Sequence, residues 1–441
     1  MKLKEIIFLI FLVAAGILFT HIQTGKLDWK IHFGEDIFFH HDIFTYHAVE
    51  KLEAPFPPFI EIINPDGPVQ VESAQSDLIR IKMEKRIHRA SESEAADIAD
   101  QLKIAVSRNN EKLIISTNRS EFDRKPFETH FTITLPAESR VVIKETSGEV
   151  RISGVKEADI SSRYGDVSAA QIKENLTIKN RHHDVEVSHV GGWCVIESTG
   201  AGIKVRDVQG RTSVQTQYGR VDLEALKNGA EVSGPQTRIT AQNIRGLLDI
   251  SSTYKPIHLQ NTGPVKINAK QSEITASGIE GSLEIKNQYA RVRLDHIRSP
   301  LLDIRGKSID INADNVKADE IYLSSSYRDI TLSDFEGKTA VVHSNGSVSL
   351  HPNESADHIR VHGDVSDIFF YWPLEKNIWL SAQTERGKIK WSLPEEPAVR
   401  MENSYTLMKS FSGEDPQHMI TLFTKYGTIR IEPAEEKTKG N

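Results

Sequence analysis

Four tyrosines recur at nearly constant spacing in the middle of the chain. They are Tyr218, Tyr254, Tyr289 and Tyr327, separated by 36, 35 and 38 residues. If each marks every second turn of a stack of strands, neighbouring rings lie about 9.6 Å apart. Aromatic faces at that distance could stack against an extended glycan or another polymer. They could equally be corner tyrosines that pack over bends and fill gaps between turns, and we favour this structural interpretation.

Three histidines form the best candidate metal site in the sequence. His182, His183 and His189 are accompanied by Asp184, and imidazole with carboxylate is a ligand set that zinc accepts. The first two histidines would share a bend, with His189 six residues beyond His183. A polar loop exposed at a bend explains the same residues, and we favour that interpretation. The sequence therefore predicts no cofactor.

Carboxylates on the outer faces of the strands offer another possible chemistry. Some parallel β-helices cleave acidic polysaccharides with calcium-binding aspartates and a basic residue. Here the base would be Arg291 or Arg293, and the carboxylates would be Asp222, Asp295, Asp303, Asp310 and Asp329. Acidic side chains on such a surface are usually only solvated, and short turns leave little chain to form a cleft. The sequence contains no GxSxG, HExxH, EF-hand or phosphate-binding glycine motif, so we predict that the chain is not an enzyme.

Charge and cysteine content narrow the class of protein further. The 441 residues carry a net charge of −7 and the basic residues are scattered, so nucleic acid is not an expected partner. The single cysteine, Cys194, excludes an intramolecular disulfide and a cysteine-based zinc site. Because it precedes Val195 and Ile196, we expect it to fill a core position as a small hydrophobic residue.

One apolar pattern organises the chain from Val150 to Val348. In each unit a bend precedes two apolar residues that are separated by one residue. The first apolar residue recurs every 17 or 18 residues, with one interval of 21 between Ile309 and Ile330. These positions are Val150, Val167, Val185, Ile203, Val221, Ile239, Ile257, Ile274, Val292, Ile309, Ile330 and Val348. A fixed period this short predicts a β-solenoid, because every rung must return to the same place above the last one.

A longer period is superimposed on this one. Similar units begin at Val208, Ile244, Ile279 and Val316, which are 36, 35 and 37 residues apart. The repeating unit is therefore a pair of rungs, each with two short strands joined at bends. Alternation within each strand would place Val, Ile and Leu inward, where β-branched side chains stack well. The predicted fold is an all-β, single-stranded, β-helix-like solenoid with about 18 residues per rung, capped at both ends.

The N-terminus has the pattern of a membrane anchor. Lys2 and Lys4 precede an apolar run from Ile6 to Phe19. As a helix, residues 3–22 would span roughly 30 Å, the thickness of a hydrocarbon core. A cleaved signal peptide is the alternative, but the residues after the run fit a cleavage site poorly. We predict an uncleaved transmembrane helix over residues 1–22 that makes the membrane a partner, with the N-terminus cytoplasmic and the rest of the chain extracytoplasmic.

The segments before the solenoid are predicted to connect and to cap it. Residues 23–58 are interpreted as a juxtamembrane connector that ends in prolines. Residues 59–146 alternate apolar and polar residues as half-buried strands do, and Ser91–Gln101 interrupts them as one short helix. This β-rich region would cover the first rung of the solenoid, which we assign to residues 147–363.

The segments after the solenoid are predicted to close it. Residues 364–433 would form its end and C-terminal cap, beginning with an insertion-like segment from Asp364 to Pro373. An aromatic cluster in this region would plug the open end of the core, although it could also be an exposed patch for a partner. Its members are Phe369, Phe370, Tyr371, Trp372, Trp379 and Trp391. Residues 434–441 are predicted to be a disordered tail.

Two short motifs carry a resemblance to a known family. The run from Ile133 to Val155 ends a strand in Leu-Pro and later contains Ser147-Gly148-Glu149-Val150 before an apolar pair and Gly154. It resembles the signature of the bacterial DUF4097 family of proposed adhesins, which is related to the toastrack domains of envelope-stress proteins. The run from His418 to Pro433 is similar to the closing strand pair of that family. The resemblance implies an extracytoplasmic β-solenoid with a binding or envelope-sensing role and no catalytic residues.

We therefore predict a non-catalytic, membrane-anchored, extracytoplasmic β-solenoid. It would be an adhesin-like binding or structural module of the bacterial cell envelope, with an envelope protein or a glycan as its partner. The first alternative is an accessory component of envelope-stress sensing. A polysaccharide-active enzyme is the second, and it requires carboxylates that gather with arginine in one groove.

Overall fold

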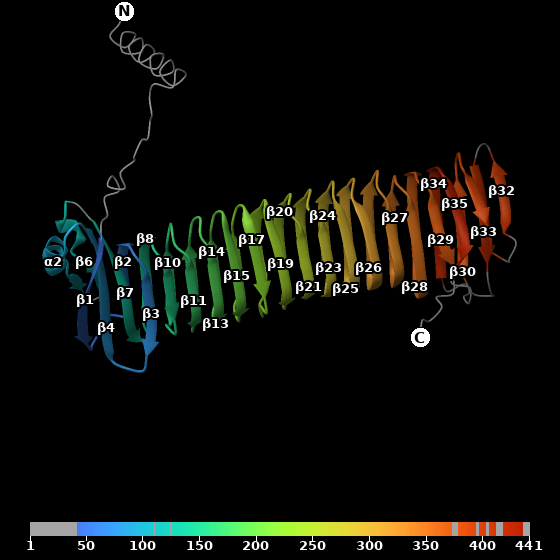
Figure 1. Ribbon diagram of the computed structural model, residues 1–441. Helices are drawn as coiled ribbons and strands as arrows, with labels where there is room; N and C mark the ends of the chain where they lie inside the picture. The colour runs from blue at the N-terminus through green and yellow to red at the C-terminus, as the bar shows by residue number, and fades with distance from the viewer. Residues whose placement is uncertain are drawn as a thin grey trace, which may run out of the picture.

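The computed structural model describes residues 42–109, 111–123, 126–372, 378–393, 397–402, 405–411 and 418–434. They form one long rod of stacked strands, which ends in the N-terminal strands and helix α2 on one side and the C-terminal strands on the other (Figure 1). None of the helices within these ranges has the length and apolarity that a membrane crossing needs. The predicted transmembrane helix, residues 1–22, lies outside the described residues.

Each rung of the rod contributes one strand to each of two parallel sheets, which confirms the predicted β-solenoid. The first sheet contains β9 (Val150–Ser153), β11 (Val167–Ile172), β13 (Val185–Val190), β15 (Ala201–Val208), β17 (Gly219–Glu224), β19 (Thr237–Ile244), β21 (Ile257–Thr262) and β23 (Ile274–Glu280). The second contains β8 (Arg140–Ser147), β10 (Glu157–Ser161), β12 (Leu176–Lys179), β14 (Cys194–Glu197), β16 (Thr212–Gln215), β18 (Ala230–Pro235), β20 (Leu248–Thr253), β22 (Val265–Lys270) and β24 (Leu283–Gln288).

Later rungs are single long strands that bend from the first sheet into the second. They are β25 (Arg291–Lys307), β26 (Asp310–Ser326), β27 (Ile330–Ser344) and β28 (Val348–Val365). The start of β25 pairs with β23 and its end pairs with β24, so one strand serves both sheets. Each of these rungs therefore still contributes to both sheets, as the earlier two-strand rungs do.

The backbone register corrects the apolar repeat at one position. Val292 lies beside Ile311, and Ile311 lies beside Ile330. Ile309, which the sequence pattern placed in this column, is also buried but stands two residues too early. The two intervals are therefore both 19 residues. The bend residue Ser308, at φ 54°, precedes Ile311 by three residues, which is the spacing from Gln271 to Ile274 and supports this register.

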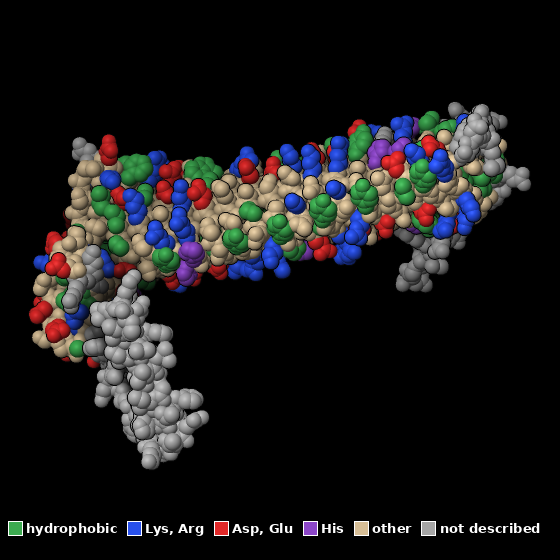
Figure 2. Space-filling view, turned by 90° about the horizontal axis from the view of Figure 1, so that it is seen from above, with side chains coloured by type: hydrophobic (Ala, Val, Ile, Leu, Met, Phe, Trp, Pro, Cys, Tyr) green, Lys and Arg blue, Asp and Glu red, His purple; other side chains and the backbone are tan. Residues whose placement is uncertain are grey.

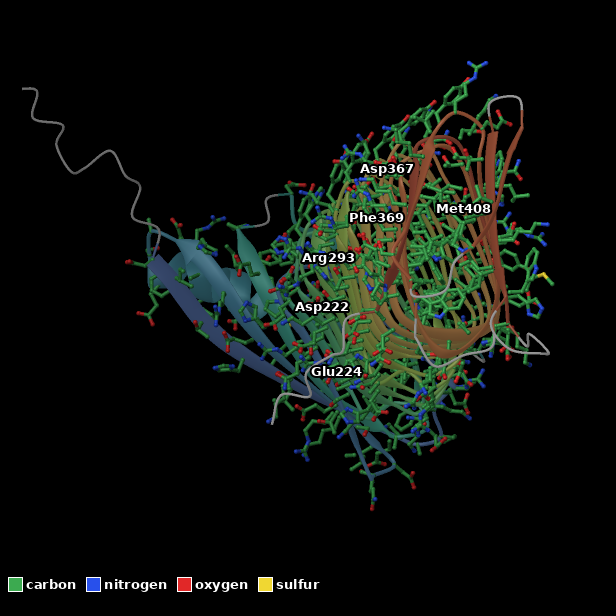
Figure 3. The ribbon with its side chains drawn as sticks, turned by 90° about the vertical axis from the view of Figure 1, so that its right-hand side faces the viewer. Asp222, Glu224, Arg293, Asp367, Phe369 and Met408 are labelled. Atoms are coloured by element: carbon green, nitrogen blue, oxygen red, sulfur yellow. The ribbon has the colours of Figure 1, made fainter. Side chains whose placement is uncertain are left out.

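A continuous apolar core lies between the two sheets. Viewed along the rod, Asp222, Arg293 and Phe369 mark the first sheet and Met408 the opposite side, with the buried side chains between them (Figure 3). One core column runs in register through Val150, Val167, Val185, Ile203, Val221, Ile239, Ile257, Ile274, Val292, Ile311, Ile330, Val348 and Ile368. Each such side chain contributes roughly 1.5–3 kcal/mol by leaving water.

The N-terminal rung is inserted into the stack. It consists of β2 (Phe59–Asp66) and β3 (Val69–Ala74). Strand β2 pairs with β6 (Lys112–Thr117) on one side and with β8 on the other. Similarly, β3 lies between β7 (Phe127–Pro136) and β9. The first rung of the chain is therefore held on both edges.

Antiparallel strands and a helix extend this end. The elements are β1 (Asp42–Glu53), β4 (Leu78–Arg89), α2 (Glu92–Gln101), β5 (Ile104–Arg108) and the 3-10 turn η2 (Arg119–Glu121). The predicted helix is confirmed, and Ser91 Oγ caps it by accepting a hydrogen bond from the Glu94 N–H at 3.4 Å. Strand β1 pairs with β4 along its full length, so this part of the predicted connector is a strand. Its alternation is weak because most of its side chains are not buried.

The C-terminal rung is also inserted. It consists of β34 (His418–Tyr426) and β35 (Thr428–Pro433). Strand β34 lies between β28 and β30 (Ile378–Thr384), and β35 lies between β29 (Ile368–Trp372) and β31 (Lys388–Trp391). Beyond β30, the second sheet continues antiparallel through β33 (Tyr405–Phe411) and β32 (Ala398–Glu402).

The segment interpreted as insertion-like is partly a regular rung strand. Ile368 of β29 pairs with Val348 of β28, 20 residues earlier. Phe370 and Trp372 point into the core, at 0% and 6% exposed, which agrees with an aromatic plug near this end. Phe369 faces outward beneath the guanidinium of Arg430, 4.9 Å from the ring centroid.

Candidate functional site: the tyrosine corner

The four tyrosines lie on one edge of the rod, where each second-sheet strand bends into the next first-sheet strand. We call this edge the tyrosine corner. Each tyrosine stands three residues before the first core position of its rung, as Tyr254 stands before Ile257. The four side chains are between 47% and 69% exposed. Seen down onto this edge, hydrophobic side chains stand at spaced intervals along the rod, with lysines and arginines beside them (Figure 2).

All four tyrosines adopt a left-handed backbone conformation. Their φ angles are 61°, 67°, 60° and 69° for Tyr218, Tyr254, Tyr289 and Tyr327. For a bulky side chain this region costs on the order of 1 kcal/mol relative to glycine. Since about half of each ring remains in contact with solvent, packing recovers only part of this cost.

The left-handed conformation also occurs at this position in rungs that have another residue in place of tyrosine. Intervening rungs place His182, Gly200, Gln236, Gln271 and Ser308 at the same point with φ between 54° and 73°. In eight of these nine rungs the N–H of this residue donates to a carbonyl of the next rung, for example from Tyr254 to Lys270 at 2.9 Å. The bends from His182 to Tyr327 therefore share a positive φ whether or not the residue is aromatic.

A fifth tyrosine belongs to the same corner and was missed in the sequence. Tyr164 stands three residues before Val167, is 50% exposed, and stacks on His182 with ring centroids 5.8 Å apart. The three-residue spacing to the core column was a usable signal. This tyrosine does not fit the 36-residue tyrosine period, because the equivalent positions of the next two rungs are His182 and Gly200.

Small polar side chains form a buried floor beneath the corner. They precede the left-handed residue by two positions, and several of them donate to the carbonyl just after the left-handed residue of the previous rung, whereas Ser198 Oγ and Thr216 Oγ1 have no hydrogen-bond partner among the described residues. Asn287 Nδ2 donates to Ser272 O at 2.7 Å, Ser325 Oγ to Ile309 O at 2.6 Å and Ser252 Oγ to Thr237 O at 3.4 Å. These bonds tie consecutive rungs together at the bend.

Two grooves follow this corner along the rod. The first has a volume of about 820 Å³ and crosses the ends of β2, β8, β10, β12, β14, β16 and β18. Six strand spacings give it a length of roughly 29 Å. The second, of about 240 Å³, lies further along at Asn268, Lys286, Arg305 and Lys307. Amide and charged side chains line both grooves, and the first also has hydroxyl side chains.

Glu145 lies in the first groove with an unusual electrostatic environment. Its side chain is nearly buried, at 6% exposed, and its Oε2 accepts a hydrogen bond from Ser162 Oγ at 2.7 Å. Its Oε1 has no hydrogen-bond partner among the described residues. Burial raises the pKa of Glu145 to about 7, outweighing the hydrogen bond from Ser162. The sequence offered no signal for this residue, since only the inserted first rung covers it.

The three histidines of the metal hypothesis have different neighbours. His182 stacks on Tyr164, while His183 Nδ1 lies 3.6 Å from Asp166 Oδ1 and His189 Nε2 lies 3.6 Å from Asp207 Oδ2. His189 also stands at the far end of β13, about 20 Å of extended chain from His183. The described residues contain no group of three or more side chains arranged to hold a metal ion.

The carboxylates of the enzyme hypothesis are dispersed along the rod. Asp222, Asp295 and Asp303 each lie within 2.8 Å of a neighbouring basic side chain, which is Arg220, His296 or Arg305 respectively. Asp310 lies 4.0 Å from Arg328, and Asp329 accepts a hydrogen bond from the Ser347 N–H. Arg293 pairs with Glu273 at 3.8 Å. Each is thus engaged in its own local contact, and these residues share no groove.

Cys194 lies in the core, as predicted. It is fully buried on β14, and burial raises the pKa of its thiol to about 12. A thiol with that pKa stays protonated and unreactive at neutral pH. It therefore contributes packing and no chemistry.

Comparison with known proteins identifies a family. Two stretches of the chain, residues 59–261 and 239–432, match the model of the family described as Toastrack DUF4097. No curated protein matches the chain. A crystal structure of a candidate cell adhesion protein from Clostridium sporogenes is 9% identical, with 88% of this chain and 99% of that chain covered and a TM-score of 0.19.

Proposed function

The chain belongs to the Toastrack DUF4097 family, and from that premise we propose that it is an adhesin-like binding module of the bacterial cell envelope. It binds an envelope component through the tyrosine corner and carries out no chemistry. A rod of stacked rungs is suited to this role, since the column from Val150 to Ile368 alone extends roughly 58 Å. Such a shape presents one surface motif many times.

The observation that carries this proposal is the exposure of tyrosine at a strained backbone position. The bends at Tyr218, Tyr254, Tyr289 and Tyr327 would be satisfied by glycine or by a short polar residue, as neighbouring rungs demonstrate. Strained conformations that packing does not require are concentrated at binding sites. Exposed rings repeated at about 9.6 Å would let a long ligand make several weak contacts at once.

We further propose that the N-terminus tethers the rod to the cell membrane. The support is the apolar run from Ile6 to Phe19 with Lys2 and Lys4 before it. Residues 1–41 precede the first described strand, β1, and line neither groove. Fractionation of cells with carbonate extraction tests this: the full chain should stay with membranes, and recovery in the soluble fraction would contradict the tether.

Binding of the purified full chain in detergent to isolated bacterial envelopes tests the main proposal. The double variant Tyr254→Asn/Tyr289→Asn should weaken binding by about tenfold, because two aromatic contacts of roughly 0.5–1.5 kcal/mol each are lost. The matched control is Gln236→Asn/Gln271→Asn, which changes the same left-handed position on intervening rungs and should leave binding unchanged. Unchanged binding with a lower melting temperature in the tyrosine variant would support the structural interpretation instead.

A further inference from the structure

The grooves beside the tyrosine corner concentrate positive charge on an acidic protein. Seven basic side chains line them and only two acidic ones do. The basic residues are Lys144, Arg163, Lys179, Arg181, Lys286, Arg305 and Lys307, and the acidic ones are Glu145 and Glu197. The whole chain, in contrast, has a net charge of −7. Segregation of charge along one edge points to a ligand of opposite sign.

Several of these cations have no acidic partner. Lys144 is held by Glu61 at 2.6 Å and Lys179 lies 3.5 Å from Glu197. Arg163, Arg181, Lys286 and Lys307 have no carboxylate oxygen of a described residue within 4.0 Å. Among these four, the two arginines stand on adjacent rungs, about 4.8 Å apart along the rod, where like charges repel.

The two carboxyl groups in the first groove, those of Glu145 and Glu197, offset little of this positive charge. Burial holds the pKa of Glu145 near 7, so the side chain is partly neutral at neutral pH. Glu197 is already engaged by Lys179. An anion entering the groove therefore meets guanidinium groups that have no ion pair, beside one carboxyl group that is partly neutral and one that is already paired.

The remaining lining and the spacing of the rings indicate the kind of anion. Hydroxyl and amide side chains at Ser161, Thr199, Gln215, Gln217 and Ser233 offer both donors and acceptors, as sugar hydroxyls require. The tyrosines recur every second rung, about 9.6 Å apart, nearly three times the ~3.4 Å step between stacked bases. Rings this far apart do not match successive bases of a nucleic acid.

Resting on the proposed function of the tyrosine corner, we propose that its ligand is an anionic glycan chain that lies along the groove. Its carboxylate or phosphate groups pair with Arg163 and Arg181, its hydroxyls bond to the polar lining, and its sugar faces pack on the tyrosines. The chain occupies the first groove and continues past the second, where Lys286 and Lys307 bind further anionic groups.

Titration of the full chain in detergent against four defined polymers tests this inference. Polygalacturonate supplies carboxylates, a poly(glycerol phosphate) polymer supplies phosphodiesters, dextran is neutral, and poly-dT is a nucleic acid. At least one of the two anionic polymers should bind, and the tighter one identifies the anionic group. Arg163→Gln/Arg181→Gln should weaken that binding by about tenfold or more, because two charge-assisted contacts are lost.

The matched control removes the same charge elsewhere. Arg151→Gln/Lys204→Gln changes two basic residues on the outer face of the first sheet, away from both grooves, and should leave binding within about twofold. Equal weakening by both double variants, or equal binding of dextran, would overturn the inference. So would tighter binding of poly-dT than of either anionic polymer.

The envelope assay separates this inference from the proposed function. If the tyrosine variant loses envelope binding while Arg163→Gln/Arg181→Gln retains it, the corner is a binding site but its ligand is not an anionic glycan. If both variants lose envelope binding, both statements are supported. The altered tyrosines and arginines are exposed, so melting temperatures should stay near the wild-type value and confirm that these variants fold.

Discussion

The two edges of the rod use the same backbone conformation with different side chains. At the edge opposite the tyrosine corner, where first-sheet strands bend into the second sheet, ten successive rungs also have a left-handed residue. This opposite corner contains Gln171, His189, Asp207, Ala225, Asn243, Asn261, Gly278, His296, Asn315 and Asp334, with φ between 49° and 67°. Most of these are residue types that tolerate positive φ.

The difference separates the backbone conformation, which both corners share, from the large aromatic side chains, which are found at one corner. At both corners the bend needs a positive φ, and at the opposite corner the residue types follow that need closely. Only the tyrosine corner places large aromatic side chains there, at every second rung. The buried residues beside the bends differ too, because the tyrosine corner has a polar floor whereas the opposite corner is lined by Val190, Ile244, Phe335 and similar side chains. We infer that one corner serves stability and the other serves binding.

The largest expected effect comes from the apolar lining of the opposite corner. Phe335 is fully buried next to the left-handed Asp334. Phe335→Ala should destabilise the protein by about 3–5 kcal/mol, through lost transfer energy and a cavity. The measurement is chemical unfolding, with the exposed Tyr327→Ala as a control that should cost far less. An equal loss of unfolding free energy in both variants would show that the tyrosines also stabilise the fold.

A smaller effect is expected at the polar floor of the tyrosine corner. Asn287 is 2% exposed and donates to the Ser272 carbonyl at 2.7 Å. Asn287→Ala should cost about 1–3 kcal/mol, because the carbonyl is left buried without a donor. Gln288→Ala, at the exposed neighbouring position, serves as the control in the same unfolding experiment. If the two variants were equally stable, hydrogen bonding between rungs would not hold this corner.

The pH dependence of stability should also differ between the corners. The folded pKa of Glu145 is about 7, above its ordinary value of 4.5, so the fold favours the protonated form. Stability is therefore highest below the ordinary pKa and is lost as pH rises through the folded pKa. Between about pH 5 and pH 8 the wild type should lose about 2 kcal/mol. Melting temperatures of Glu145→Gln should lack this component, and an identical pH profile would disprove the assignment.

The smallest expected effect is an exchange of residue types between the corners. Tyr254→Asn should raise stability by up to about 1 kcal/mol, since asparagine tolerates positive φ better than tyrosine. The reciprocal Asn243→Tyr at the opposite corner should lower stability by a similar amount. Paired melting curves would measure both. A loss of stability in Tyr254→Asn would mean that ring packing outweighs the backbone strain.

The repeat could be predicted in detail because parallel, in-register stacking requires apolar residues at a nearly constant interval in the sequence. Each rung must place an apolar residue over the last, so Val167, Val185 and Ile203 recur at a near-constant interval. The pattern failed at Ile309 because that residue is buried as well, and apolar type alone cannot separate two buried positions in one bend. Only the pairing of Ile311 with Ile330 resolves the register.

The site was only partly predictable. The four tyrosines were visible from their spacing, and Tyr164 could have been found from its distance to Val167. Their backbone conformation was not visible, because the same bend accepts Gln, Gly, His or Ser. Both the grooves and the burial of Glu145 depend on which strands become neighbours.

The sequence by itself determined the rung length, the inward and outward faces and the position of the tyrosines, because these depend on contacts that repeat with a short period. Only the tertiary structure decided where the first and last described rungs lie. Insertion of β2–β3 beside β8–β9, and of β34–β35 beside β28–β29, pairs strands that are distant in sequence. Such pairings leave no period to detect, since each occurs once. They depend on loop closure and edge pairing, which are properties of the folded chain.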